Sequence, residues 1–276
     1  YIKMEDAARK LFIIEVPFCI ASVLMVISAL VLFFTIKENE LAEEMAEEME
    51  EGERQAAVET PIDDNKPMSK ANRNMLWAIL IAEFMWFMSD NSLGTYIGNY
   101  VIYYLGQSSG KTMILVIIGG LASVIGFGTA GSVADRIGRK WTISIGLGCT
   151  LLGLIIMCFT KPGLSFPVIL YVVWFIKGLG MAYVHNCSFP MVVELCSSKK
   201  IGKFTGYYYA ASQSAQTITP VLLGLILTKT LLWNTLPVYA TILTAISFVV
   251  FTLFVKNIKA SKVANVKGLE ALGGDD

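Results

Sequence analysis

The stretch GSVADRIGRK, residues 131–140, decides the fold. It holds one acid, three bases and two glycines, and it lies between two apolar runs that are each long enough to cross a membrane. Over the whole chain, 55% of the residues are hydrophobic, 16% are charged and the mean hydropathy is +0.60. An ordinary soluble domain has about 25% charged residues. We therefore expect a membrane protein in which this stretch is a polar turn at the membrane surface.

The apolar runs define the architecture. A spanning helix needs about 20 mostly apolar residues, and the chain offers such runs at about 11–36, 75–104, 113–133, 141–160, 166–192, 207–228 and 236–255. The first run is separated from the others by an acidic linker, because residues 38–64 contain twelve of the twenty-two acids. The sequence predicts an all-α, polytopic protein with seven transmembrane helices, arranged as one plus six.

The placement of the bases predicts the orientation. Thirteen Lys and Arg residues lie at the end of the linker (residues 66–73), in the quoted turn, in the loop around 199–203 and after residue 255, whereas the alternate loops hold three. Basic loops stay on the cytoplasmic side. We expect the linker and the carboxyl terminus to be cytoplasmic in a multi-pass protein of the cell membrane, although Lys3, Arg9 and Lys10 fall on the opposite side.

Several classes of function are disfavoured. Five cysteines and one histidine, without a CxxC pair, give no disulfide framework and no metal site. The stretch GQSSGKT at 106–112 has three residues where a phosphate-binding loop has four, and no strand precedes it. The two charge signs balance, which gives no reason to expect nucleic-acid binding. We expect no enzyme and no cofactor.

The quoted turn resembles the signature loop of the major facilitator superfamily, G-x-x-x-D-R-x-G-R-K. The matching residues are Gly131, Asp135, Arg136, Gly138, Arg139 and Lys140. Glycine at 131 allows a close approach of two helices, and glycine at 138 allows a tight turn. Asp135 can accept a hydrogen bond or favour a helix amino terminus, and the bases keep the loop inside.

The resemblance implies a twelve-helix fold of which this chain supplies helices six to twelve. Residues 1–36 would be the last helix of the amino-terminal half, 37–73 the central cytoplasmic linker, 74–256 the six-helix carboxyl-terminal half and 257–276 a cytoplasmic tail. The chain starts at Tyr1, without Met, and we interpret it as the later part of a longer reading frame. Helices one to five would then be its missing partner, and the fragment is not expected to transport by itself.

A narrower resemblance points to a substrate. The stretches WFMSDNSLGTYIGNYVIYYLG (86–106) and SFPMVVELCSSKKIGKFTGYYYAASQSAQTITPVLLG (188–224) are similar to bacterial members of the solute-carrier group that includes sucrose and other disaccharide–proton symporters. That resemblance implies that Glu194 pairs with Arg136 or Arg139. Such a pair would latch the cytoplasmic gate in one state of an alternating-access cycle and release it in the other.

Charged groups inside the spans are the candidates for the proton and substrate pathway. Glu83 and Asp90 are seven residues apart, so they lie within about 20° on one helical face. Asp90, nearer mid-span, is the preferred candidate, and Asn91 is a hydrogen-bonding neighbour for a polyol. Lys177 is available to pair with Asp90 or Glu83. His185 lies about 80° around its helix from Lys177, so the two need not face one cavity, and a packing role is the commoner one for a lone histidine.

The sixth span adds uncharged polar groups. Tyr209, Gln213, Gln216, Thr217 and Pro220 fall on one face, and amides, hydroxyls and an aromatic ring suit a sugar. Bonding between helices is the alternative role for these groups. Gly206, Ala210 and Ser214 form a small-residue ridge that favours close helix packing. The tyrosines at 96, 100, 103 and 104 are expected to anchor the membrane interface.

The prediction is therefore a secondary active transporter that works by alternating access, with proton-coupled uptake of a disaccharide-like sugar as its activity. Its partners would be a small solute, a proton and the lipid bilayer. Two alternatives stay open: a multidrug or small-metabolite exporter of the same superfamily, and a seven-helix receptor or scaffold that moves no solute. The sequence leaves the substrate, the coupling ion, the direction and the oligomeric state undecided.

Overall fold

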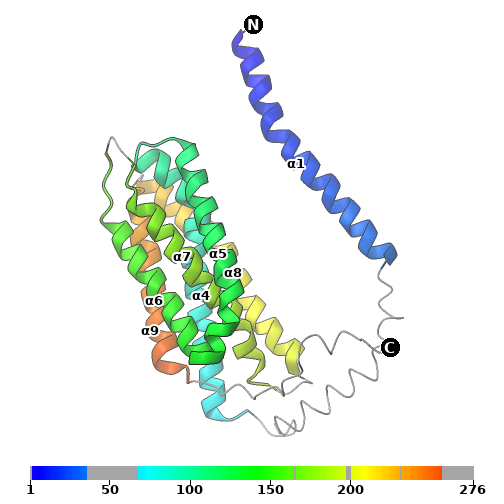
Figure 1. Cartoon of the computed structure of the whole chain (residues 1–276), viewed down its shortest axis with the longest axis vertical. Helices are drawn as coiled ribbons and strands as arrows, with labels where there is room; N and C mark the ends of the chain where they lie inside the picture. The colour runs from blue at the N-terminus through cyan, green and yellow to red at the C-terminus, as the bar shows by residue number, and fades with distance from the viewer. Residues whose placement is uncertain (1, 36–67, 164–165, 197–199, 231, 257–276) are drawn as a thin grey trace. The chain divides into compact units, whose positions relative to one another are not determined.

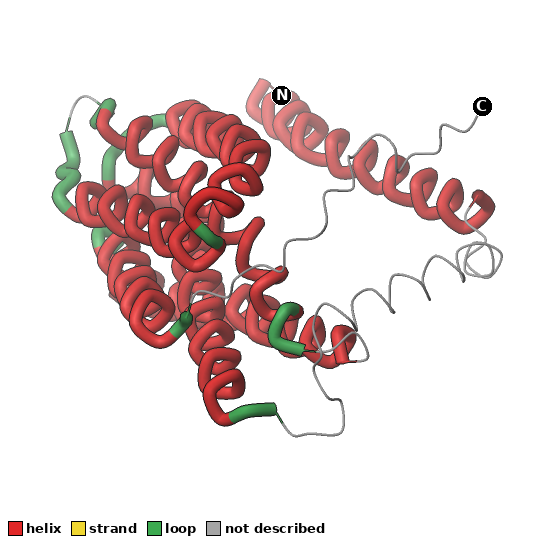
Figure 2. Tube along the Cα trace, turned by 60° about the horizontal axis from the view of Figure 1, so that its bottom comes forward, coloured by secondary structure: helices red, strands yellow, loops and turns green. Residues whose placement is uncertain are grey.

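The computed structural model describes residues 2–35, 68–163, 166–196, 200–230 and 232–256. In these residues it contains seven α-helices and one π-helical segment, joined by turns (Figures 1 and 2). The chain divides into two compact units, Tyr1–Val58 and Glu59–Asp276. The greater part of the acidic linker, at 36–67, and the tail at 257–276 lie outside the described residues.

The first unit contributes α1, Ile2–Thr35. The stretch Phe18–Thr35 has a mean hydropathy of 2.6 and none of its residues is buried. Large apolar side chains such as Met25, Phe33 and Phe34 are not covered by other residues of this unit. The predicted span at 11–36 is thus a helix that extends further toward the amino terminus.

The second unit is a six-helix bundle. Its elements are α4 (Lys70–Asn99), the π-helical segment η1 (Tyr100–Tyr104), α5 (Ser109–Ile137), α6 (Arg139–Cys158), α7 (Ile169–Val193), α8 (Ile201–Thr230) and α9 (Thr235–Phe254). Each of the six predicted spans of this unit is confirmed as a helix. The helix α4 starts before the predicted residue 75 because the Ser69 hydroxyl caps it by accepting a 3.1 Å hydrogen bond from the amide of Asn72.

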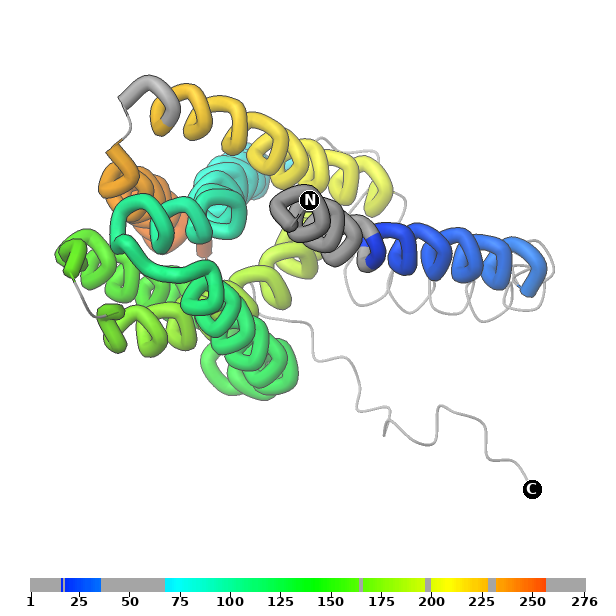
Figure 3. The backbone as a smooth tube through the Cα atoms, turned by 90° about the horizontal axis from the view of Figure 1, so that it is seen from above, coloured from blue at the N-terminus to red at the C-terminus, as the bar shows by residue number. Residues whose placement is uncertain are grey.

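The bundle is built of two similar sets of three consecutive helices, α4–α6 and α7–α9. The helix α7 packs against α5 and α6 of the other set, and α4 packs in the same way against α8 and α9. The third helices of the two sets, α6 and α9, also meet. Figure 3 looks along the helices and shows α4, in cyan, next to α8 in yellow and α9 in orange. Exchanging α4–α6 for α7–α9 maps these pairs onto one another. The unit therefore has the internal repeat that is common in transporter halves.

Glycines set the closeness of the packing around α7. A Cβ placed on Gly178 would collide with the carbonyl oxygen of Gly119 on α5, and one on Gly180 would lie 2.5 Å from the carbonyl oxygen of Gly146 on α6. Lipid is as apolar as the helix surfaces, so helices in a membrane associate through close packing and hydrogen bonds. The predicted ridge of Gly206, Ala210 and Ser214 is exposed on α8 among the described residues, so close packing along it stays a prediction.

Hydrogen bonds join α4 to α9. The Ser89 hydroxyl donates to the carbonyl oxygen of Ala240 at 2.9 Å and lies 2.7 Å from the Thr244 hydroxyl. One turn away, the Ser247 hydroxyl donates to the carbonyl oxygen of Ala82 at 2.9 Å. Bonds of this kind between membrane helices contribute about 0.6 kcal/mol on average. They hold α4, the helix that carries the candidate acids, against α9.

Five of the described helices are long and apolar enough to cross a membrane by length and composition: α1, α5, α6, α8 and α9. The two that fall short, α4 and α7, contain Glu83, Asp90, Lys177 and His185. Charged residues lower the hydropathy of a helix, and a bundle tolerates them only where they face protein or water. The two exceptions to the apolar pattern are thus the helices that carry the acidic and basic candidates for the pathway.

One expectation for the aromatic residues is wrong. Tyr100 is fully buried, and its hydroxyl lies 2.5 Å from that of Thr160. The Tyr104 hydroxyl donates to the carbonyl oxygen of Thr160, and the Tyr96 hydroxyl donates to that of Pro220 at 2.8 Å. Only Tyr103, 67% exposed, is placed as an interface anchor would be. The other three tie η1 and α4 to neighbouring segments.

Candidate functional site

The centre of the bundle holds an ion pair between α4 and α7. The Lys177 ammonium lies 2.5 Å from a carboxylate oxygen of Asp90, and the two side chains are 14% and 28% exposed. The rest of α4 and α7 have few contacts with each other. Of the two acids that Lys177 was expected to meet, the structure selects Asp90.

His185 and two aromatic residues complete this central cluster. His185 lies close enough to Asp90 for an electrostatic interaction, and the His185 ring lies 4.9 Å from the ring of Phe87. Lys177 lies over the ring of Trp174 at 5.3 Å. The helical angle between Lys177 and His185 gave no reason to expect both near one acid. Trp174 was detectable in the sequence, since it lies three residues before Lys177 on the same face.

The Asn91 side chain makes its hydrogen bond within its own helix. Its side-chain amide donates a 2.8 Å hydrogen bond to the carbonyl oxygen of Phe87, one turn earlier on α4. Its side-chain oxygen is left as the group that can accept a hydrogen bond. A role in binding a polyol stays a prediction.

Glu83 lies apart from the central cluster and is 0% exposed. Within the described residues neither of its carboxylate oxygens has a hydrogen-bond partner. Tyr208, on α8, is close enough to interact with it electrostatically, and the Tyr208 hydroxyl lies 2.9 Å from that of Ser188 on α7. The sequence analysis missed Tyr208 and Ser188, because nothing in the run YYY tells which tyrosine faces the core.

The polar residues predicted on the sixth span form a strip along α8. Gln213 and Thr217 are exposed, Tyr209 is 52% exposed, and Gln216 is partly buried. The Tyr209 ring contacts the rings of Phe189 and Tyr208. We call Tyr209, Gln213, Gln216 and Thr217 the α8 polar strip. The structure leaves it facing outward from the six-helix unit and does not bring it to the Asp90–Lys177 pair.

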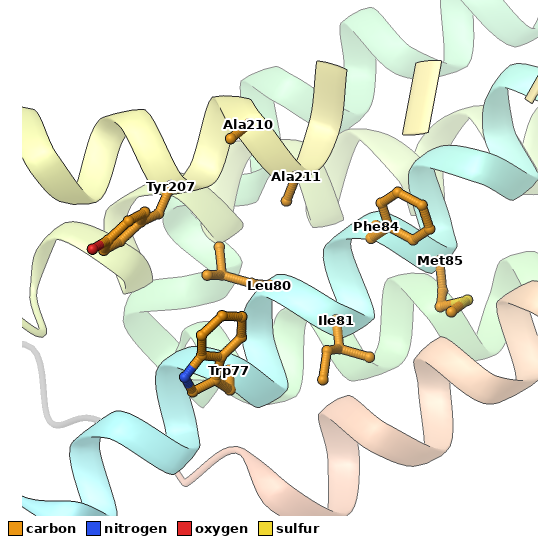
Figure 4. Close-up of a pocket in the computed structure, with 8 residues that line it drawn as sticks. All are labelled: Trp77, Leu80, Ile81, Phe84, Met85, Tyr207, Ala210 and Ala211. Atoms are coloured by element: carbon orange, nitrogen blue, oxygen red, sulfur yellow. The ribbon is translucent and has the colours of Figure 1, made fainter. Parts of the chain in front are cut away.

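An apolar groove of about 350 Å³ lies between α4 and α8. Figure 4 shows its lining: Trp77, Leu80, Ile81, Phe84 and Met85 from α4, and Tyr207, Ala210 and Ala211 from α8. Almost all of its surface is carbon. A sugar needs paired hydrogen bonds, and this groove offers few groups that could form them.

The signature residues lie where α5 ends and α6 begins, with Gly138 alone between the two helices. Gly138 has a φ of 87°, a conformation that favours glycine, and it ends α5 and starts α6. Arg139, the first residue of α6, forms an ion pair with Glu194 at the end of α7. The resemblance offered Arg136 or Arg139 as the partner of Glu194, and in this structure the partner is Arg139. Whether this contact acts as a gate stays a prediction.

Other signature residues do not make the contacts that were expected of them. A Cβ on Gly131 would meet nothing within 4 Å among the described atoms, so the expected close approach does not occur there. The reason is helical geometry, since Gly131 lies about 140° around α5 from Gly126, which does contact α7. Asp135 and Arg136 are exposed, and α6 has no side-chain cap. Lys140 lies over the ring of its neighbour Trp141 at 5.2 Å.

In the part of the chain that the structure describes, no group of three or more His, Cys, Asp or Glu residues could hold a metal ion. The charged groups of the bundle meet in pairs, Asp90 with Lys177 and Glu194 with Arg139. Pairs of this kind can hold two helices together or be broken by a proton or a solute. They do not form the arrangement of a nucleophile and a base that covalent catalysis needs.

Comparison with known proteins agrees with this geometry. The chain has no match among curated proteins. The family model described as Major Facilitator Superfamily matches residues 79–272, which is more than half of the 276 residues and includes most of the six-helix unit, the turn and Glu194. Members of this family are multi-pass membrane transporters of small solutes. The chain belongs to the major facilitator superfamily.

Proposed function

We propose that the chain is part of a secondary active transporter that couples the uptake of a disaccharide-like sugar to the entry of protons. Five further helices would complete its solute pathway. The basic ends of the helices would face the cytoplasm in the cell membrane. The observation that carries this proposal is the outward-facing α8 polar strip.

The α8 polar strip cannot face lipid at low cost. Gln213 lies near the middle of the 30-residue helix α8 and is exposed in the six-helix unit. A side-chain amide without hydrogen-bond partners in hydrocarbon costs several kcal/mol, on the order of 4–8. The strip must therefore meet water or another part of a transporter. A water-filled pathway between two halves satisfies this need, and amides and hydroxyls there would bind sugar hydroxyls.

The central cluster provides the second part of the pathway. Asp90, Lys177 and His185 lie inside the bundle, where charged groups usually mark a route for ions or solutes. The pair links α4 of the first three-helix set to α7 of the second. Breaking and restoring this link would change the relation of the two sets, as alternating access requires.

The test uses the complete protein in proteoliposomes with an imposed proton gradient. Labelled sucrose, maltose and glucose are offered to the wild type, Asp90→Asn and Gln213→Leu. We expect gradient-driven accumulation of at least one disaccharide by the wild type, and its loss in both variants. Ile218→Val, on the same exposed side of α8, is the control and should accumulate sugar normally. If a folded, correctly oriented wild type accumulates none of the sugars, the sugar proposal is wrong.

The apolar groove between α4 and α8 favours a second candidate, an exporter of apolar compounds. Its lining of aromatic and aliphatic side chains resembles what a lipophilic solute requires. Efflux of a fluorescent lipophilic cation, lost in Phe84→Ser and retained in Gln213→Leu, would favour the exporter. The opposite pattern of losses would favour the sugar carrier.

A further inference from the structure

The Glu83 carboxyl group is isolated in the core of the bundle. Its neighbours one turn away on α4, Ile79 and Trp86, are fully buried in the same core cluster as Tyr208. Among the buried side chains of the described residues, Glu83 is the only Asp, Glu, Lys or Arg. Neither of its oxygens has a hydrogen-bond partner there.

The groups packed around α4 do not neutralise a charge on Glu83. The helix α8 supplies the phenols of Tyr208 and Tyr209, α7 supplies the Cys187 thiol and His185, and the packed part of α9 supplies only apolar side chains and the Ser247 and Thr244 hydroxyls. The two cations that α6 and α7 place in ion pairs have acidic partners of their own, Lys177 with Asp90 and Arg139 with Glu194. No charged partner acts on Glu83 in this part of the chain.

An unpaired carboxylate in such a place is too costly to persist. Moving an ionised carboxyl group from water to an apolar interior costs so much that the group takes up a proton instead. Glu83 therefore carries a proton in this conformation. Asp90, seven residues later on the same helical face, is ionised because Lys177 lies against it. Two acids on one helix are thus held in opposite protonation states by their surroundings.

We propose that Glu83, and not Asp90, is the proton-binding site of the transporter. A proton bound at Asp90 would have to displace the Lys177 ammonium, whereas Glu83 binds a proton without breaking any contact. This inference deepens the proposed proton-coupled function and rests on it for its consequence in transport. The protonation of Glu83 itself is measurable without transport.

The position of Glu83 explains how its proton would control the helices. Tyr208 of α8 and Ser188 of α7 bond to each other beside it, so three helices meet at this point. Loss of the proton leaves a negative charge there with only hydroxyl groups nearby. Water is needed to stabilise that charge, and it enters only if α4 separates from α7 or α8. Release of the proton is thereby tied to opening of the bundle near the ends of the helices that carry Arg139 and Glu194.

The first experiment is infrared spectroscopy of the purified chain in lipid nanodiscs at neutral pH. We expect the absorption band of a protonated, buried carboxylic acid in the wild type. The band should disappear in Glu83→Gln and remain in Asp90→Asn, which serves as the matched control. Because glutamine has the shape and neutrality of the protonated acid, the melting temperature of Glu83→Gln should equal that of the wild type. A band that is absent from the wild type, or that survives in Glu83→Gln, overturns the inference.

The second experiment uses the complete protein and labelled sucrose. Exchange of sugar between the two sides of the membrane needs no net movement of protons, whereas accumulation against a gradient does. Glu83→Gln should therefore keep exchange and lose accumulation altogether. A variant that still accumulates sucrose overturns the inference. A wild type that neither exchanges nor accumulates sucrose contradicts sucrose transport instead, and the infrared result then decides on Glu83.

Discussion

Glu83 and Asp90 show how two identical functional groups on one helical face acquire different chemistry. The sequence places them seven residues apart, on one side of α4, and favours Asp90 as the pathway carboxylate that binds a proton or the substrate, because it lies nearer mid-span. The structure pairs Asp90 with Lys177 at 2.5 Å and leaves Glu83 fully buried without a cation. Helical geometry fixes which residues share a face, but the neighbours contributed by α7 and α8 decide the charge that each acid holds.

The Asp90–Lys177 pair leads to a prediction about stability. Lys177→Met should leave the Asp90 carboxylate without its cation, at a cost between the about 1 kcal/mol of an exposed pair and the about 3–5 kcal/mol of a buried one. The double variant Asp90→Asn/Lys177→Met should recover most of this loss, because no charge is then left unpaired. Thermal unfolding in detergent of the two single variants and the double variant measures the coupling. If the stability losses of the two single variants simply add in the double variant, the two residues are not coupled.

At the scale of elements, α7 is the helix against which α5 and α6 pack. Its glycines at 178 and 180 point to different neighbours, Gly119 on α5 and Gly146 on α6. The sequence analysis did not identify these contacts, because two alternating glycines are compatible with several partner helices. The signature Gly131, expected to be such a contact, is exposed.

The contact between Gly178 and Gly119 gives a prediction about helix packing. Gly178→Ala places a methyl group against the Gly119 backbone, which cannot move as a side chain would, and should destabilise the bundle by about 1–3 kcal/mol or more. Gly120→Ala is the control, since a Cβ there meets nothing within 4 Å. It should stabilise α5 slightly, by roughly 0.5–1 kcal/mol. The melting temperatures of the two variants should therefore move in opposite directions, and equal shifts would disprove the contact.

The ion pair between Arg139 and Glu194 connects the start of α6 to the end of α7, and its loss should loosen this end of the bundle. Cys196, two residues beyond Glu194 and buried, reports on this. With the other four cysteines replaced, Arg139→Gln should make Cys196 react with a maleimide several-fold faster, and Arg139→Glu/Glu194→Arg should restore slow labelling. Lys140→Gln, in the same turn, should have no effect. Fast labelling in the charge-swapped protein would show that the pair does not hold this end closed.

At the scale of the whole molecule, the six-helix unit is a packed body with one surface that does not suit lipid. Its exposed side chains are mostly apolar, as expected in a bilayer, but the α8 polar strip is not. The unit therefore needs water or more protein along α8. This requirement comes from the solvation of Gln213 and Thr217 and does not depend on the family resemblance.

The orientation of the molecule is testable with two exposed serines at opposite ends of α5. In a protein without native cysteines, Ser108→Cys should react with a membrane-impermeant thiol reagent in intact cells, and Ser132→Cys should react only after the cells are permeabilised. The reason is that Ser132 lies in the basic turn, which resists translocation. Labelling of Ser132→Cys in intact cells would reverse the proposed topology.

The sequence by itself determined the class, the helices and the family. Runs of about 20 apolar residues leave the backbone no alternative to helices in a bilayer, and the turn at 131–140 matches a signature whose family the comparison confirms. Only the tertiary structure decided that Arg139 meets Glu194, that Lys177 meets Asp90, and that Glu83 is buried without a cation. Periodicity along one helix specifies a face, whereas the dielectric surroundings and the charge partner of a side chain come from helices distant in sequence.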